Sequence, residues 1–350
     1  MAPLNLYPLL RPLLFSLDPE TAHNVTVRLL RMARRIGANR LLFPSVPDRP
    51  TQVMGLAFPN PVGLAAGMDK DGSSVDAWSA LGFGFLEIGT VTPRPQPGNP
   101  RPRIFRIPRA KALINRMGFN SPGVDAVVAN LEKISYRGVL GINIGKNKET
   151  PIDRAADDYL ACYSKVYPFA SYVAVNISSP NTEGLRELQL VENLRCLLSA
   201  LFEAREKLLR EYGRCVPLVV KIAPDLDEKQ METMAAVFRD LKIDALIATN
   251  TTVQRPEVEN DPRSREAGGL SGTPLRPLSD RPIRFFHERL GTIPIIGSGG
   301  ILSGADARDK IDAGCSLLQV YTGLVYRGPG LIREIVKFID GKAESPLKNR

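Results

Sequence analysis

The sequence is poor in residues on which several classes of enzyme depend. Its 350 residues include 4 cysteines, 2 histidines and 1 tryptophan. Because His23 and His287 are the only histidines, a histidine-based zinc site or a Ser-His-Asp triad is disfavoured, and we expect no metal. The cysteines show no Cys-x-x-Cys spacing, which predicts reduced, packed thiols of a cytoplasmic protein. They are Cys162, Cys196, Cys215 and Cys315.

Two further patterns are missing. No Gly-x-Gly-x-x-Gly turn occurs early in the chain, where a doubly wound dinucleotide-binding sheet would need it. No apolar run reaches the roughly 20 residues that span a bilayer, since the stretch 4–15 is far shorter. This stretch also lacks the small-residue cleavage site of a signal peptide, and nothing before it resembles a mitochondrial presequence. We therefore expect neither a spanning helix nor a targeting segment.

Basic residues outnumber acidic ones, with a formal net charge of +9 at pH 7. The sequence has no recognised nucleic-acid motif and no basic stripe interleaved with aromatics, so we predict no nucleic-acid partner. The excess is marked near the N-terminus, which favours an anionic membrane surface, anionic small ligands or both. The residues concerned are Arg11, Arg28, Arg31, Arg34, Arg35 and Arg40, against Asp18 and Glu20.

Continuous apolar runs alternate along the chain with amphipathic stretches. Such alternation predicts a parallel sheet covered by helices, and eight units make a (β/α)₈ TIM barrel of about 250 residues. An open doubly wound sheet is the competing architecture. The apolar runs are 61–66, 85–89, 139–144, 172–177, 218–222, 245–249, 294–297 and 317–321. The amphipathic stretches are 73–81, 124–131, 152–166, 188–209, 228–241, 283–290, 305–313 and 331–339.

Polar residues follow most of these runs, where a TIM barrel carries its active site. The most informative segment is Asn176–Thr182, in which two carboxamides and a serine pair follow a buried strand. Amide and hydroxyl groups can hold a planar, amide-rich ligand, and a well-placed serine can remove a proton from it. A plain Asx or Ser turn is the alternative. The residues at the strand ends are Lys70, Thr90, Asn143, Asn176, Lys221, Thr249, Asn250, the turn Gly297–Gly300, Tyr321 and Thr322.

Glycine-rich turns follow the seventh and eighth predicted strands. Backbone N–H groups in such turns bind phosphate, and the usual phosphate site of a TIM barrel is built by these two loops. Lys221 lies at the inner end of its strand, where a buried cation needs an anionic or electron-rich partner. A flavin, whose reduced ring carries negative charge near its N1–C2 edge, would meet that need. A salt bridge inside the barrel is the alternative.

Three segments lie outside the barrel pattern. The proline cluster 93–108 is too long for a simple turn, and we expect an ordered excursion over the catalytic face rather than a floppy loop. The polar segment 253–274 could act as a lid. Near the N-terminus, Asp18-Pro19-Glu20 starts a helix and Gly37 ends it. We expect residues 1–40 to form two amphipathic helices that lie on a membrane, with packing against the barrel as the alternative, and residues 41–350 to form the catalytic barrel.

Six motifs follow one another along the chain. They are Gly67–Gly72, Asn115–Asn120, Ile142–Asn147, Asn176–Asn181, Gly268–Gly272 and Tyr321–Gly323. Together they resemble the motifs of the dihydroorotate dehydrogenase family, specifically its membrane-associated, quinone-reducing class, and the similarity runs from about His23 to the C-terminal helix. In the soluble class the catalytic base is a cysteine and the N-terminal helices are absent, whereas here the matching position is Ser179 and the helices are predicted.

The resemblance implies bound FMN and oxidation of dihydroorotate to orotate in pyrimidine synthesis. Ser179 would take the proton from C5 while hydride leaves C6 for flavin N5, and a serine needs a proton relay for this. The substrate positions implied are Lys70, Asn115, Arg116, Met117, Gly118, Phe119, Asn176, Asn181, Asn250 and Thr251. The FMN positions implied are Ala66, Gly67, Met68, Asp69, Lys70, Thr90, Asn143, Asn176, Lys221, Thr249, Gly272, Gly300, Tyr321 and Thr322.

For the second half-reaction the resemblance implies a membrane quinone, which would enter between the N-terminal helices. His23, Arg106 and Tyr321 would lie at the inner end of its tunnel. We expect a peripheral enzyme on the cytoplasmic side of a bacterial inner membrane. Two rival functions remain, namely an FMN barrel that acts on a related pyrimidine with a soluble electron donor, and a non-redox barrel that binds a phosphorylated metabolite.

Overall fold

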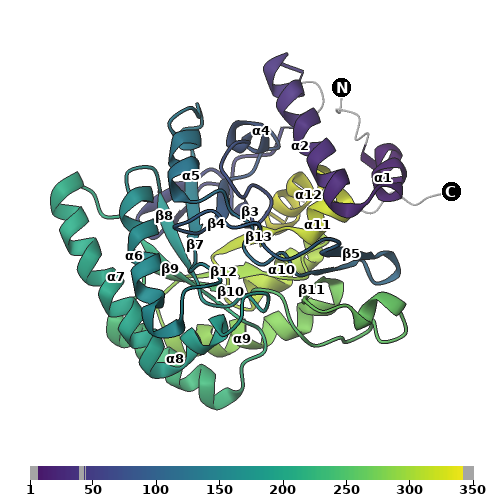
Figure 1. Cartoon of the computed structure of the whole chain (residues 1–350). Helices are drawn as coiled ribbons and strands as arrows, with labels where there is room; N and C mark the ends of the chain where they lie inside the picture. Colours follow the sequence, from purple (N-terminus) through teal and green to yellow (C-terminus); the bar gives the residue numbers. More distant parts are fainter. Residues whose placement is uncertain (1–6, 39–42, 44, 342–350) are drawn as a thin grey trace.

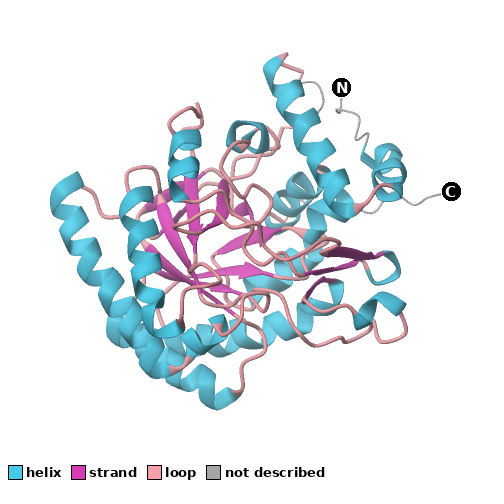
Figure 2. Ribbon diagram, in the orientation of Figure 1, coloured by secondary structure: helices cyan, strands magenta, loops and turns pink. Residues whose placement is uncertain are grey.

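Eight parallel strands form a closed barrel in the computed structural model, which describes residues 7–38, 43 and 45–341 (Figures 1 and 2). Every residue of these strands is buried, which explains why they are continuously apolar rather than alternating. The predicted TIM barrel is therefore confirmed, and the open sheet is excluded. Around the barrel the strands are β3 (Val62–Leu64), β4 (Phe85–Val91), β7 (Val139–Ile144), β8 (Tyr172–Asn176), β9 (Leu218–Ile222), β10 (Ala245–Ala248), β12 (Ile295–Ser298) and β13 (Leu317–Val320).

Helices surround the barrel on its outside (Figure 2). They bury apolar faces against the strands, and the largest buried cluster fills the space between the two layers. One predicted boundary is wrong: the helix expected from Ile283 begins at Arg276 and carries Pro282 in its interior. The helices are α4 (Val75–Ser79), α5 (Val124–Leu131), α6 (Ala155–Val166), α7 (Val191–Tyr212), α8 (Glu228–Leu241), α9 (Arg276–Leu290), α10 (Gly304–Asp312), α11 (Thr322–Arg327) and α12 (Gly330–Ile339).

The amino-terminal end of the barrel is closed by a hairpin that the sequence pattern did not reveal. Strands β1 (Thr51–Val53) and β2 (Leu56–Phe58) pair antiparallel. Their side chains Val53 and Phe58 pack in one cluster with the side chains that fill this end of the barrel, and the ring of Phe58 meets that of Phe85 edge to face. Because this end is sealed by apolar packing, the opening of the barrel lies at the carboxyl ends of the strands.

A second sheet covers part of that open end. Strands β5 (Ile104–Ile107), β6 (Ala112–Asn115) and β11 (Gly269–Gly272) form an antiparallel sheet in the order β11-β6-β5. The proline cluster 93–108 is thus an ordered excursion, as predicted, and its end is β5. Segment 253–274, expected as a polar loop, carries β11 near its end. Strand β11 pairs with β6, which lies more than 150 residues earlier in the chain.

Two N-terminal helices are present as predicted. They are α1 (Tyr7–Ser16) and α2 (Pro19–Arg35). The side chain of Asp18 caps α2 by accepting from the backbone N–H groups of Glu20 and Thr21, at 3.0 Å each. Gly37 follows the helix with a φ of +72°. The predicted boundary between residues 40 and 41, like Arg40 itself, lies outside the described residues.

These helices rest against one side of the barrel, next to α4, α11 and β5 (Figure 1). Glu20 of α2 forms an ion pair of 2.7 Å with Arg103, whose side chain is 6% exposed. Arg103 also donates to the backbone carbonyls of Pro97 and Asn99, at 2.8 and 3.0 Å. Helix α2 is therefore tied to the proline-rich segment that covers the open end of the barrel.

The prediction of packed thiols is half right. Cys162 and Cys315 are buried, whereas Cys196 and Cys215 are exposed. Cys196 lies on the outer face of α7, and Cys215 lies in the loop that leads to β9, so neither position faces the core. All four thiols are free.

Candidate active site

A cavity opens where the eight strands end, beneath β5, β6 and β11. It brings together Ser179 and most of the residues that the resemblance implies, from nine separate segments of the chain. Of the implied substrate positions it is lined by Lys70, Asn115, Met117, Gly118, Phe119, Asn176, Asn181, Asn250 and Thr251. Of the implied FMN positions it is lined by Ala66, Gly67, Lys70, Thr90, Asn176, Lys221, Thr249, Gly272, Gly300, Tyr321 and Thr322.

Four implied positions lie outside the lining of this cavity. Arg116 turns away, donates to Glu266 at 2.6 Å and stacks over the Phe105 ring. Asn143 is fully buried behind the wall. Met68 and Asp69 are buried beside it, and burial together with the neighbouring Asp71 raises the pKa of Asp69 to about 7. These side chains support the wall rather than face its interior.

Hydrogen bonds among neutral side chains hold the floor of the cavity. Thr90 donates through Oγ1 to Asn143 Oδ1 at 2.6 Å. Asn176 donates through Nδ2 to both of those oxygens, at 3.1 Å each. Asn250 donates to Ser178 Oγ at 3.0 Å, which in turn donates to Asn176 Oδ1 at 3.0 Å. These hydrogen bonds fix the orientation of each side-chain amide. The donors and acceptors that face the cavity are therefore in place before a ligand binds.

A charged cluster lies below this floor. Lys221 Nζ is 3.7 Å from Glu87 Oε1, and both side chains are buried. Glu87 also accepts from Tyr172 Oη at 2.9 Å, Gln319 Nε2 at 2.6 Å and Asn143 Nδ2 at 3.0 Å. The salt bridge considered as an alternative for Lys221 is therefore present. The lysine nevertheless lines the cavity, so its charge is available to a ligand there as well.

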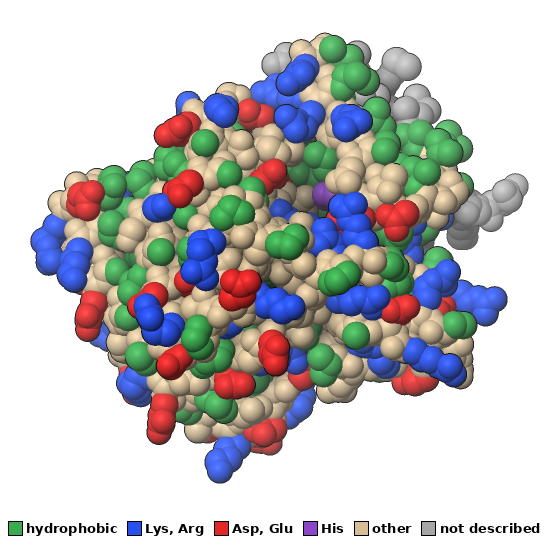
Figure 3. Space-filling view, viewed as in Figure 1, with side chains coloured by type: hydrophobic (Ala, Val, Ile, Leu, Met, Phe, Trp, Pro, Cys, Tyr) green, Lys and Arg blue, Asp and Glu red, His purple; other side chains and the backbone are tan. Residues whose placement is uncertain are grey.

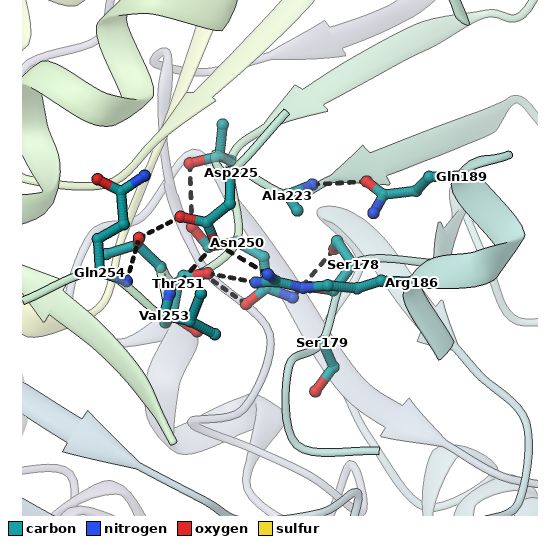
Figure 4. Close-up of polar contacts among 12 residues, drawn as sticks. Ser178, Ser179, Arg186, Gln189, Ala223, Asp225, Asn250, Thr251, Val253 and Gln254 are labelled. Atoms are coloured by element: carbon teal, nitrogen blue, oxygen red, sulfur yellow. Dashed lines mark hydrogen bonds and ion pairs between the residues drawn. The ribbon is translucent and has the colours of Figure 1, made fainter. Parts of the chain in front are cut away.

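Ser179 lies in the loop after β8, and its hydroxyl points away from the polar network around Arg186 (Figure 4). It is 6% exposed and lines the cavity. Its Oγ accepts from the backbone N–H of Asn181 at 3.2 Å, and Asn181 donates through Nδ2 to Asn115 Oδ1 at 3.2 Å. The serine therefore sits beside two carboxamides, on a loop whose backbone is itself hydrogen-bonded.

The sequence pattern missed a hydroxyl near this serine. Thr182 is buried, and among the described residues its Oγ1 has no hydrogen-bond partner. A buried hydroxyl without a partner is costly unless water or a ligand satisfies it. Thr182 ends the segment Asn176–Thr182, so it was within the motif, but no local signal distinguished it from an ordinary turn residue.

Lys70 follows β3, which lies next to β13 in the barrel. Its Nζ donates to the carbonyl of Gly67 at 2.8 Å. Loss of hydration lowers its pKa to about 8, with Glu20 opposing that shift. A lysine in this state is charged at neutral pH but gains much from an anionic partner, as a ligand carboxylate would be.

Glycines in the turn after β12 and at the end of β11 leave backbone groups facing the cavity. Gly299 and Gly300 adopt φ values of +109° and +75°, which favour glycine. A Cβ at Gly300 would lie 2.6 Å from the backbone of Arg276, and one at Gly272 would lie 2.2 Å from the backbone of Lys111. Side chains cannot occupy these positions, so backbone groups face the cavity directly. This is the surface that a phosphate needs.

A second cavity, of about 540 Å³, lies between the barrel and helices α1 and α2. Its lining is almost entirely apolar, and His23, Arg106 and Tyr321 are among the few polar residues in it. Burial lowers the pKa of His23 to about 4, with nearby Lys70 adding to the effect. Arg106 donates to the carbonyls of Phe15 and Leu17, at 3.2 and 2.7 Å. The implied quinone residues therefore share one cavity, which meets the polar one at Tyr321.

The outer surface of these helices is both basic and apolar. Arginine side chains gather over α2, and hydrophobic side chains lie beside them and over α1 (Figure 3). Leu9 and Leu13 are 77% and 66% exposed, which is unusual for leucine, while Leu6 lies outside the described residues. Within the described part of the chain, no helix is both long enough and apolar enough to cross a membrane.

The cavities also contain residues that the strand-end pattern could not indicate. Ile104 and Leu113 belong to β5 and β6 and line both cavities. Gln319 points inward from β13, and its Oε1 is buried without a partner among the described residues. The sequence pattern predicts where each barrel strand ends. It does not predict which side chains of the separate sheet β11-β6-β5 cover those ends.

A family model described as dihydroorotate dehydrogenase matches residues 50–342. The dihydroorotate dehydrogenase (quinone) of Burkholderia thailandensis is 58% identical over 336 residues, which cover 96% of this chain and 97% of that protein. The protein of the same description from Burkholderia multivorans is 57% identical, with 96% and 97% covered.

Solved structures agree in fold. The crystal structure of DHODH from Eimeria tenella in complex with ferulenol has a TM-score of 0.82 and 40% identity, covering 91% of this chain and 90% of that chain. The ligand-free structure from the same organism has a TM-score of 0.83 and 40% identity, covering 91% and 93%.

Proposed function

Because this chain belongs to the dihydroorotate dehydrogenase family of flavin-dependent oxidoreductases, we propose that it oxidises dihydroorotate to orotate and passes the electrons to a membrane quinone. One observation carries the proposal. A polar cavity at the barrel mouth and an apolar cavity under the N-terminal helices meet at Tyr321, Ile104 and Leu113. A polar substrate and a hydrophobic electron acceptor therefore have separate sites that are close together.

The polar cavity fits FMN. The glycine-rich turn at Gly299 and Gly300 offers backbone groups to a phosphate, and Lys221 offers a positive charge to the ring. Gln319 Oε1, which has no partner in the part of the chain that the structure describes, is a further group that a ring N–H could meet. Bound FMN would supply the hydride acceptor, at its N5 atom. The residues proposed to hold it are the implied FMN positions named above, with Asn143, Met68 and Asp69 acting from behind the wall.

The remaining polar groups suit the substrate, a ring with amide and imide groups and one carboxylate. Lys70 would pair with the carboxylate. Asn115, Asn176, Asn181 and Asn250 would read the N–H and C=O edges of the ring, since carboxamides carry both donors and acceptors. Hydrogen bonds with one another and with Asn143 fix the orientation of these amides before the substrate arrives, which lowers the entropic cost of ordering them on binding.

Ser179 would remove the proton from C5 of the substrate. A serine hydroxyl must give up its own proton to do so, and it therefore needs a route for that proton. The buried hydroxyl of Thr182, three positions later, is the candidate for the next member of this route, with water between or beyond the two groups. The backbone N–H of Asn181 donates to Ser179 Oγ, which stabilises negative charge on that oxygen.

The apolar cavity would admit the quinone. Exposed leucines of α1 and the basic face of α2 suit peripheral attachment to an anionic membrane, from which a hydrophobic quinone could pass directly between the helices. His23 and Arg106 are then the polar groups available to the quinone carbonyls at the inner end. We place this attachment on the cytoplasmic side of a bacterial inner membrane.

The test is to reduce the purified holoenzyme anaerobically with dihydroorotate and to follow reoxidation of the flavin. A short-chain quinone should restore the oxidised spectrum rapidly, whereas NAD or another soluble carrier should not. Rapid reoxidation by the soluble carrier alone would support the rival FMN barrel. A colourless protein that binds no flavin but retains a phosphorylated metabolite would support the non-redox alternative.

A further inference from the structure

Arg186 joins three loops at the mouth of the barrel. It lies in the short helix η3 (Leu185–Gln189), after β8, and Figure 4 shows its guanidinium at the centre of a polar network. Nε donates to the carbonyl of Ser178 at 3.2 Å. Nη2 donates to the carbonyl of Thr251 at 3.0 Å, and Nη1 pairs with Asp225 at 2.9 Å. The loops after β8, β9 and β10 are thus connected through one side chain.

Asp225 extends this connection to the covering segment 253–274. Besides Arg186 it accepts from the hydroxyl of Thr252 and from the backbone N–H of Val253, the latter at 3.2 Å. Thr252 Oγ1 in turn accepts from the backbone N–H of Gln254 at 3.0 Å. The side chains of Arg186 and Asp225 are 25% and 11% exposed, so the pair is partly shielded from solvent and stronger than a fully exposed ion pair.

Arg186 itself faces away from the cavity and is not among the residues that line it. Its contact is with the carbonyl of Ser178, the residue directly before Ser179. A planar guanidinium that makes three separate contacts fixes a loop more firmly than a flexible ammonium could. Without it, the peptide that carries Ser179 would be held mainly by the contacts of Ser178 and Asn181.

We propose that Arg186 is a positioning residue for proton abstraction, an inference that rests on the proposed role of Ser179. Its guanidinium clamps the Ser178 carbonyl to the loops after β9 and β10 and keeps the Ser179 hydroxyl turned into the cavity. The ion pair with Asp225 makes this geometry depend on the placement of residues 252–254, the start of the covering segment. The placement of that segment and the alignment of the base are thereby linked.

The test uses holoenzyme variants in anaerobic stopped-flow reduction by saturating dihydroorotate. Arg186→Ala should slow flavin reduction by roughly 10- to 100-fold, as a misplacement of about 1 Å can. Orotate affinity should change much less than the reduction rate, because Arg186 forms no hydrogen bond with any of the four carboxamides proposed to bind the ring. Arg186→Lys and Asp225→Asn should fall between this variant and the parent. In a Ser179→Ala background, Arg186→Ala should slow reduction no further, since the group it positions is already gone.

Arg205 provides a matched control outside the three loops. Its Nη1 pairs with Asp244 at 2.7 Å, with side chains 16% and 28% exposed, and Asp244 also accepts from the backbone N–H of Leu218 at the start of β9. Because this ion pair lies at the amino-terminal ends of β9 and β10, Arg205→Ala should lower the free energy of unfolding, as Arg186→Ala should, yet leave flavin reduction at the parent rate. Denaturant titration measures the loss of stability in both variants without any turnover.

Three results would overturn the inference. They are full-rate reduction by Arg186→Ala or by Asp225→Asn, equal slowing by Arg205→Ala, and additive slowing when Arg186→Ala is combined with Ser179→Ala. If Arg186→Ala fails to fold, Arg186→Lys and Asp225→Asn decide the question alone. Full-rate reduction by Ser179→Ala would instead refute the proposed role of that serine, so the two failures are distinguishable.

Discussion

The two cavities differ in how their walls are held. The polar cavity is built from strand ends, and nearly every side chain in its floor is fixed by hydrogen bonds to another strand. The apolar cavity is walled by two helices added to the outside of the barrel, held by side-chain packing and by a few polar ties such as Glu20 to Arg103. The first site is therefore preset by the barrel, whereas the second depends on the docking of α1 and α2.

This contrast implies that different variants should impair the two half-reactions separately. The largest effect should come from Ser179→Ala, which should slow flavin reduction by dihydroorotate by roughly 10² or more, as expected on losing a general base. FMN content and orotate affinity should stay nearly normal, because Ser179 is proposed to hold neither. Stopped-flow absorbance measures the reduction rate.

Reoxidation of the same Ser179→Ala protein by quinone is the internal control and should proceed at the parent rate. Ser179→Cys should keep part of the reduction rate, because a thiolate can serve as the base. Reduction of Ser179→Ala at near-parent rate would remove this serine from the mechanism.

Deletion of residues 1–37 should instead impair the second half-reaction, the transfer of electrons to quinone. The truncated protein should still bleach its flavin with dihydroorotate, since every proposed substrate and flavin residue lies later in the chain. It should lose most of its quinone reductase activity and no longer sediment with anionic liposomes, because the apolar cavity loses one wall and the basic, leucine-rich surface is gone. It should also need less detergent.

Both half-reactions and liposome binding are measured on one truncated preparation. Quinone turnover that survives the deletion intact would contradict the placement of the quinone between the helices and favour a soluble acceptor. A loss of dihydroorotate reduction as well would show that α2 also supports the polar cavity, through Glu20 and Arg103.

A smaller effect should follow from changes to the charged cluster under the polar cavity. Lys221→Ala should weaken FMN retention or slow its reduction, because a buried cation near the ring stabilises negative charge there. It should also lower the free energy of unfolding by about 3–5 kcal/mol, because Glu87 is left buried without its cation. Equilibrium dialysis and denaturant titration measure the two effects.

The added substitution Glu87→Gln separates these effects. Gln319 Oε1 has no partner among the described residues, so its amide can rotate to accept from the new carboxamide. The double variant should regain stability but still retain FMN poorly. If it binds FMN and turns over like the parent, the lysine serves the fold alone.

The smallest effect near neutral pH concerns Lys70. With a pKa of about 8, the lysine is charged below that pH and loses its charge above it. Orotate affinity should therefore be constant at lower pH and fall by about tenfold per unit once the pH is well above 8. Isothermal titration across this range measures it. Lys70→Arg, which stays charged throughout, should give a flat profile, and an unchanged decline in that variant would place the titration elsewhere.

Much of the architecture could be read from local pattern. Runs such as Val139–Ile144 and Tyr172–Asn176 are continuously apolar because both faces of each strand are covered, and this pattern together with the intervening helices is enough to predict the barrel. The strand ends then place Thr90, Asn176, Lys221 and Thr249 at one opening, since all parallel strands point the same way. Residue type and order were sufficient for these conclusions.

Contacts between distant segments could not be obtained in that way. The pairing of β6 with β11, the ion pair of Lys221 with Glu87 and the clamp of Arg186 on three loops depend on how the barrel closes. The start of α9 was missed because Pro282 mimics a helix start, while packing holds it in a helix interior. Local sequence sets the conformation and burial of each segment, but only closure of the barrel decides which polar groups come within hydrogen-bonding distance of one another.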